Sequence, residues 1–127
     1  MQASRQDRRR HVRVRVRRLT LQFRRGGVLR ILLFFRKADR QAPVVDCSDG
    51  GLMIVAAEAI KRGTPVTLRM HPSFFPVKLT LKGKVSHCRR RTRAGGETAY
   101  EVGVELGKPT RDYQLMVKRL REDPTLK

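Results

Sequence analysis

The sequence has no tryptophan, two cysteines and few acidic residues. These shortages limit the classes of protein to which the chain can belong. Aromatic residues make up 6% of the chain, and Asp and Glu together number 11 among 127 residues. Cys47 and Cys88 are too few for a disulfide scaffold, so we expect free thiols in a reducing compartment. No run approaches the ~18 consecutive apolar residues of a membrane span, and the amino terminus has no apolar stretch typical of a signal peptide. Length and composition therefore predict a single cytoplasmic domain.

The residue types that support catalysis or metal binding do not occur at recognisable spacings. His11, His71 and His87 have no Ser, Cys or acidic residue placed to form a catalytic pair or triad. Cys47, Cys88 and His87 are scattered along the chain, whereas a metal site needs a spaced set of ligands. We expect neither an enzyme nor a metal site, and we expect Cys47 to be a small core residue rather than a redox sensor.

Basic residues are abundant and are concentrated near the amino terminus. The chain has 30 Lys and Arg and a formal net charge of +19. Residues 1–40 hold 14 of these cations against Asp7 and Asp39 alone. Most are arginine, whose planar fork matches phosphate and the guanine edge, although codon usage in a genome rich in G and C is an alternative explanation for any single arginine. The charge predicts a polyanionic partner.

Alternating apolar and polar residues predict a series of short strands with one face exposed to water. The first run slips between Val16 and Leu19, where we expect a bulge or bend. Residues 89–96 are expected to form a polar, flexible connection. The expected strands cover about 12–23, 28–35, 42–46, 52–57, 66–70, 77–85 and 100–106, with turns at 26–27, 48–51 and 63–65. The fold class is therefore predicted as all-β with a C-terminal helix, built on a small six- to seven-stranded antiparallel barrel.

The end of the chain changes from a strand period to a helix period. Thr110 is a candidate helix cap, and Pro124 marks the expected stop. The predicted apolar stripe consists of Tyr113, Met116, Val117 and Leu120. We expect this stripe to pack across the mouth of the barrel, with binding of a partner as the alternative. The predicted division is a flexible basic arm at 1–11, the barrel at 12–107, and the helix and tail at 108–127.

Two short motifs carry the functional prediction. Arg9 and Arg13 form an RxxxR pair where the arm meets the first strand, and residues 46–51 form a DxSxxG turn between strands. Together with the Gly-Thr-Pro-Val segment at 63–66, the Tyr-Glu-Val-Gly-Val-Glu segment at 100–105 and the final helix, this order resembles the PilZ domain. The alternative for Asp46 and Ser48 is a turn held by its own side-chain to backbone hydrogen bonds.

The resemblance implies a six-stranded barrel that acts as a receptor for cyclic di-GMP, with no metal and no covalent step. It implies these ligand-binding residues: Arg8, Arg9, Arg10, Arg13, Asp46, Ser48, Gly50 and Gly51. In the family, an arginine just ahead of the RxxxR pair accompanies an intercalated ligand dimer, so Arg8 implies two ligand molecules per site. The chemistry is coherent, because arginine forks suit phosphates and guanine acceptors, and the Asp46 carboxylate suits the guanine N1 and N2 donors.

Three questions stay open at the level of sequence. A nucleic-acid-binding module, in which the arm and residues 89–93 clamp a phosphate backbone, competes with the receptor hypothesis, although exposed aromatic residues are scarce. An adaptor that acts through protein contacts alone is a further alternative, and the downstream protein partner is not identified. Residues 28–35 form either a buried strand or an edge for self-association.

Overall fold

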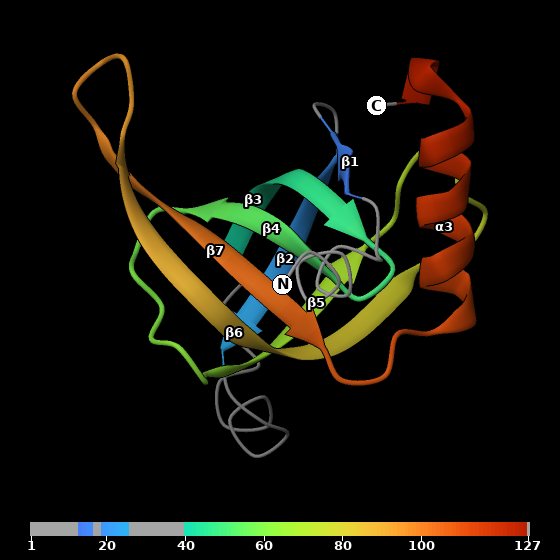
Figure 1. Cartoon of the computed structure of the whole chain (residues 1–127), viewed down its shortest axis with the longest axis horizontal. Coiled ribbons are helices and arrows are strands. Elements are labelled where there is room, and N and C mark those ends of the chain that lie inside the picture. Colours follow the sequence, from blue (N-terminus) through green and yellow to red (C-terminus); the bar gives the residue numbers. More distant parts are fainter. Residues whose placement is uncertain (1–12, 17–18, 26–39, 127) are drawn as a thin grey trace, which may run out of the picture.

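The computed structural model describes residues 13–16, 19–25 and 40–126 (Figure 1). Within these residues the strands form a barrel, and a single α-helix stands beside it. The elements are β1 (Val14–Arg15), β2 (Thr20–Arg25), β3 (Arg40–Ser48), β4 (Gly51–Ala56), β5 (Pro65–Met70), β6 (Leu79–Thr92), β7 (Thr98–Leu106), α3 (Arg111–Glu122) and the 3₁₀ turn η1 (Pro124–Leu126). The predicted strand at 28–35 and the turn at 26–27 lie outside the described residues.

Antiparallel pairing closes six of the strands into a barrel. The strand order is β1-β3-β2-β5-β6-β7-β4, and an additional pairing between β3 and β4 completes the ring. Strand β1 is the extra strand and pairs only with the end of β3, with Val14 opposite Cys47. Closure leaves the six barrel strands without the unpaired edges of an open sheet. The predicted fold class is therefore confirmed.

The bulge or bend expected between Val16 and Leu19 falls on residues 17 and 18, which lie between β1 and β2 in the sequence and outside the described residues. Both strands pair along the same edge of β3, and backbone hydrogen bonds continue across the boundary, from Val16 N to Val45 O and from Val44 N to Leu19 O, each 2.8 Å long. This arrangement matters for function because it brings the residues just before β1 beside the carboxyl end of β3, where the DxSxxG turn begins.

The apolar residues of each strand point into one core, which α3 extends. The helix begins after Thr110, whose Oγ1 accepts a hydrogen bond from Tyr113 N at 3.1 Å. Its predicted stripe of Tyr113, Met116, Val117 and Leu120 is fully buried. The helix packs against β1 and β3 at one side of the barrel (Figure 1). The predicted cap and the role of the predicted stripe as part of the core are thus confirmed.

One prediction about local structure is wrong. Residues 89–92 are not a flexible connection but the last part of β6, which pairs with β7 as far as Thr92 opposite Thr98. On the exposed side of this ribbon, the Arg89 guanidinium hydrogen bonds to the Glu101 carboxylate, and Arg91 Nη1 lies 3.1 Å from Glu101 Oε2. A glutamate opposite two arginines stabilises a strand pair that a run of like charges alone would disfavour. Only the tip at 93–97 is a turn, with Gly96 at φ +84°.

Candidate ligand-binding cleft

An open cleft of about 560 Å³ lies on the outer face of the barrel, next to the start of α3. It is formed where β1, β3, β4, β7 and β6 lie side by side. Its lining consists of Arg13, Asp46, Ser48, Asp49, Gly50, Gly51, Leu52, Ser86, His87, Gly103, Val104, Glu105, Leu106, Pro109 and Gln114. The cleft therefore contains every candidate site residue of the described part of the chain, whereas Arg8, Arg9 and Arg10 lie outside the described residues.

Strand register explains why residues distant in sequence meet here. Arg15 is opposite Asp46, Asp46 is opposite Met53, Met53 is opposite Gly103, and Gly103 is opposite His87. These five residues form one row across β1, β3, β4, β7 and β6. Arg15, Met53 and Gly103 each lie between two buried core residues of their strand, so the row faces outward. Irregularities in β3 before Asp46 and in β6 before His87 adjust the register at both sides of the row.

Arg13 and Asp46 face each other across the mouth of the cleft. Arg13 Nη1 lies 3.4 Å from Asp46 Oδ1, and the two side chains are 62% and 16% exposed, respectively. Burial raises the pKa of the Asp46 carboxyl, and the guanidinium groups of Arg13 and Arg15 oppose that rise. A long, exposed ion pair of this kind contributes little to stability. Both side chains are therefore available to turn toward a ligand at small cost.

The DxSxxG turn is held in place by contacts on several sides. Ser48 Oγ donates a hydrogen bond to Gly51 O at 3.4 Å, and Tyr113 Oη of α3 donates to the same oxygen at 2.7 Å. Gly50 O accepts from Leu106 N of β7 at 3.0 Å. Burial raises the pKa of the Tyr113 hydroxyl, which keeps it protonated as a donor. Ser48 thus has a structural contact within the turn, and its hydroxyl retains capacity for further hydrogen bonds.

Gly51 is required by close packing rather than by a special backbone angle. A Cβ at this position would collide with the carbonyl oxygen of Val104 on the neighbouring strand β7. The glycine therefore lets β4 and β7 approach each other directly below the cleft. Behind the turn, Cys47 is 1% exposed, and burial raises the pKa of its thiol to about 12. Cys47 is consequently an unreactive core side chain, as predicted, and both cysteines are free.

Sequence reasoning missed the wall that β6 and β7 contribute. The imidazole of His87 lies against Gly103, where any Cβ would collide with the ring. Ser86 Oγ donates to Gly103 O at 3.1 Å and lies 3.3 Å from His87 Nδ1. A signal was available, because the alternation at 101–105 places Gly103 on the outer face between Glu101 and Glu105. An outward glycine in a strand marks a place where another group approaches the backbone closely.

The described residues carry neither a metal-binding cluster nor a membrane-spanning helix. No group of three or more His, Cys, Asp or Glu side chains in the described ranges is placed to hold a metal ion. None of the helices in the same ranges has the length and apolar character needed to cross a bilayer. The chemistry of the cleft is that of hydrogen bonding and charge, with a carboxylate, a guanidinium, a hydroxyl, an imidazole and exposed backbone side by side.

Solved structures with the same fold include domains of three bacterial proteins. The PilZ domain with c-di-GMP of YcgR from Escherichia coli has 12% identity and a TM-score of 0.63, with 89% of this chain and 88% of that chain covered. The K. pneumonia MrkH-c-di-GMP complex has 17% identity and a TM-score of 0.58, and the Bacillus subtilis Inhibitor of motility (MotI/DgrA) has 16% and 0.64. For both, 93% of this chain and 52% of that chain are covered, so this chain spans about half their length.

At the level of sequence, one comparison is negative and one is positive. No curated protein sequence matches the chain. The sequence profile of the PilZ domain matches residues 7–122, which is nearly the whole chain and includes both motifs. The chain therefore belongs to the PilZ domain family.

Proposed function

We propose that this protein is a receptor for cyclic di-GMP and that the nucleotide binds in the cleft described above. The observation that carries the proposal is the meeting of Arg13 and Asp46, 3.4 Å apart, at the mouth of a cleft that also contains the whole DxSxxG turn. Membership of the PilZ domain family supports it. The solved structures of the YcgR PilZ domain with c-di-GMP and of the MrkH-c-di-GMP complex have the same fold, which adds further support.

The side chains in the cleft match the functional groups of the ligand. The Asp46 carboxylate accepts hydrogen bonds from N1 and N2 of one guanine, a pairing that a neutral side chain would make more weakly. Arg13 turns from Asp46 toward a phosphate or the guanine O6 and N7 acceptors. Ser48 contributes a hydroxyl, and Gly50 and Gly51 let the ligand approach the backbone. No step of this binding breaks or forms a covalent bond, so the proposed role is that of a receptor rather than an enzyme.

The basic arm completes the proposed site. Residues 1–11 end two positions before Arg13 in the sequence, so the chain reaches the cleft from the arm within a few residues. Arg8, Arg9 and Arg10 are proposed to contact the ligand phosphates and to fold the arm over the bound nucleotide. Arg8 also favours two stacked ligand molecules in the open cleft. Ordering of the arm changes the surface that the receptor presents to a downstream protein partner, which is how the signal would pass on.

Isothermal titration calorimetry with cyclic di-GMP tests the proposal. Each of Arg9→Ala, Arg13→Ala and Asp46→Ala is expected to weaken binding at least about tenfold, because a hydrogen bond to a charged group contributes roughly 1.5–3 kcal/mol. Arg111→Ala, which removes an exposed arginine on α3 outside the cleft, serves as the matched control and should bind as the wild type does. The stoichiometry of the wild type distinguishes one ligand from two.

The proposal fails if the wild type gives no binding heat, or if all three variants bind with unchanged affinity. Circular dichroism of each variant excludes unfolding as the cause of a loss. Protection of the arm from limited proteolysis on addition of ligand tests the separate statement that the arm folds over the nucleotide.

A further inference from the structure

The three strands β2, β5 and β6 contain no acidic residue. They hold eight Lys and Arg: Arg24, Arg25, Arg69, Lys82, Lys84, Arg89, Arg90 and Arg91. The acidic residues of the described chain lie on β3, β7, α3 and the connections: Asp46, Asp49, Glu58, Glu97, Glu101, Glu105, Asp112, Glu122 and Asp123. In the closed strand order, β2 and β5 lie across the barrel from β7 and β4. The barrel thus has an acid-bearing side with the cleft and an acid-free side opposite to it.

Strand register gathers three of these cations, one from each strand, into one surface. Gln41, Gln22, Arg69 and Thr80 follow one another across β3, β2, β5 and β6. In the next outward-facing row, Arg24 is opposite Thr67, which is opposite Lys82. We call the surface formed by these seven residues and Lys78 the basic face. Its side chains are cationic, amide or hydroxyl groups, and none is aromatic.

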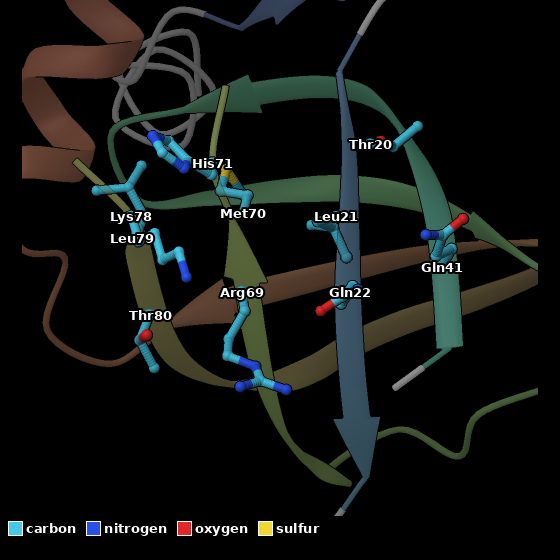
Figure 2. Close-up of a pocket in the computed structure, with 10 residues that line it drawn as sticks. All are labelled: Thr20, Leu21, Gln22, Gln41, Arg69, Met70, His71, Lys78, Leu79 and Thr80. Carbon is cyan, nitrogen blue, oxygen red and sulfur yellow. The ribbon is translucent and has the colours of Figure 1, made fainter. Parts of the chain in front are cut away.

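The basic face is hollowed at two adjoining places. A groove of about 300 Å³ has Arg69, His71 and Lys78 along its lining, with Gln22, Gln41 and Thr80 among the other polar groups (Figure 2). A neighbouring hollow of about 480 Å³ is lined by Lys82, Lys108 and Thr110. Among the described residues, no carboxylate forms an ion pair with Lys78, Lys82 or Lys108. These lysines therefore present their full charge to solvent.

We infer that the basic face binds the phosphate backbone of duplex nucleic acid. Lys, Arg, Thr and Gln are side chains that contact phosphate and sugar in such complexes. The absence of aromatic residues from the face favours a duplex over a single strand, because single-strand binders stack bases on aromatic rings. Four strands spaced about 4.8 Å apart span roughly 14 Å, enough to reach phosphates on both sides of a groove about 12 Å wide. The inference does not rest on the proposed ligand site, since none of the eight residues of the basic face lines the cleft.

Fluorescence anisotropy with a labelled 20-base-pair duplex of random sequence, over a series of salt concentrations, tests the inference. The test variant is Lys78→Gln/Lys82→Gln. The matched control is Lys61→Gln/Lys118→Gln, which removes the same charge at two exposed lysines outside the basic face, one between β4 and β5 and one on α3. With a slope of about −0.9 per phosphate neutralised, the test variant should lose about two units of log–log salt slope. We expect its affinity at 0.1 M salt to fall at least about tenfold, while the control keeps the slope of the wild type.

Several outcomes would overturn the inference. They are no binding of the duplex by the wild type at low salt, equal losses in the test and control variants, tighter binding of a single strand of the same length, or binding of anionic phosphatidylglycerol vesicles in place of the duplex. Calorimetry with cyclic di-GMP on Lys78→Gln/Lys82→Gln tests whether the variant is folded. It also tests whether the nucleotide and the duplex bind at different sites. Its ligand affinity should equal that of the wild type if the wild type binds the nucleotide.

Discussion

Asp46 is the residue whose chemistry the proposed site depends on most. Its carboxylate must be charged to accept hydrogen bonds from guanine, yet its position at the edge of the barrel removes part of its hydration. Burial raises the pKa of Asp46, and the nearby Arg13 and Arg15 only partly offset this effect. The site therefore places an anion where folding disfavours it, as is common for binding groups that a ligand later satisfies.

The pH dependence of ligand affinity follows from this shift. As pH falls from 7 toward about 4, Asp46 takes up a proton before an ordinary aspartate would, and the protonated acid no longer accepts both guanine hydrogen bonds. We expect the affinity for cyclic di-GMP to fall over this range. Calorimetry at a series of pH values checks the expectation, with Asp46→Asn as control, since the residual affinity of that variant lacks the Asp46 contribution. An identical pH profile in both proteins would contradict it.

Ionisation of Asp46 favours ligand binding but lowers the stability of the fold. Because the folded pKa is raised, the contribution of Asp46 to folding is most favourable when the acid is protonated and is lost as pH rises through the folded pKa. At pH 7 the charged carboxylate costs stability, and its long, exposed contact with Arg13 returns little. Asp46→Asn should therefore unfold in urea at a concentration no lower than the wild type, which makes it a folded variant for the binding experiments.

At the scale of elements, helix α3 is joined directly to the DxSxxG turn. Tyr113 donates to Gly51 O at 2.7 Å, and Arg121 Nη2 lies 3.7 Å from Asp49 Oδ1. The hydrogen bond from Tyr113 is buried and has a well-defined geometry, whereas the contact between Arg121 and Asp49 is an exposed ion pair. A ligand that presses on the turn would therefore act on α3 through the Tyr113 contact.

Tyr113→Phe removes this link while keeping the ring in the core. We expect the free energy of unfolding to fall by about 0.5–1.5 kcal/mol, the usual net contribution of one hydrogen bond. The affinity for cyclic di-GMP should fall as well, because Gly51 O loses its 2.7 Å hydrogen bond from α3 and the turn is held less firmly. Urea unfolding and calorimetry measure the two effects. Gln114→Ala on the next helix position is the control for unfolding, and a Tyr113→Phe protein indistinguishable from wild type in both assays would contradict the expectation.

The elements also show where the local sequence pattern was sufficient to predict secondary structure and where it was not. Turn residues followed by apolar segments predicted β4 and β5 almost to the residue, and the cap and stripe of α3 are as expected, because neighbouring residues alone carry those signals. The arginines at 89–91 misled the prediction, because a run of like charges has no local reason to form a strand. The reason lies in Glu101, twelve residues beyond Arg89, whose carboxylate contacts Arg89 and Arg91 across the ribbon. Only the pairing of β6 with β7 brings them together.

The whole molecule is dominated by its positive charge. A formal net charge of +19 on 127 residues produces self-repulsion that disfavours the compact state. The separation of acidic residues onto the cleft side leaves Lys78, Lys82 and Lys108 without a carboxylate partner among the described residues. Stability in solution should therefore depend on screening, and the same property supplies the attraction to polyanions on which both proposals depend.

Thermal unfolding at increasing NaCl concentration measures this repulsion. Between 10 mM and 0.3 M salt, the Debye length falls from about 30 Å to less than 10 Å, so repulsion across the barrel is screened. We expect Tm to rise by several degrees, equivalent to about 1 kcal/mol, and then to level off. KCl should reproduce the curve, since screening depends on ionic strength. A Tm that is constant or falls over this range would show that the net charge does not limit stability.

The sequence by itself determined the fold class, the positions of most elements and the motif residues around 13 and 46–51. It could do so because period, turn chemistry and capping are properties of adjacent residues. Tertiary structure alone decided that β3 pairs with β4 to close the barrel, that Ser86, His87 and Gly103 form the second wall of the cleft, and that Arg24, Arg69 and Lys82 share one surface. These features depend on strand register between segments far apart in the chain, and a shift of one residue would turn each of those side chains to the other face of the sheet.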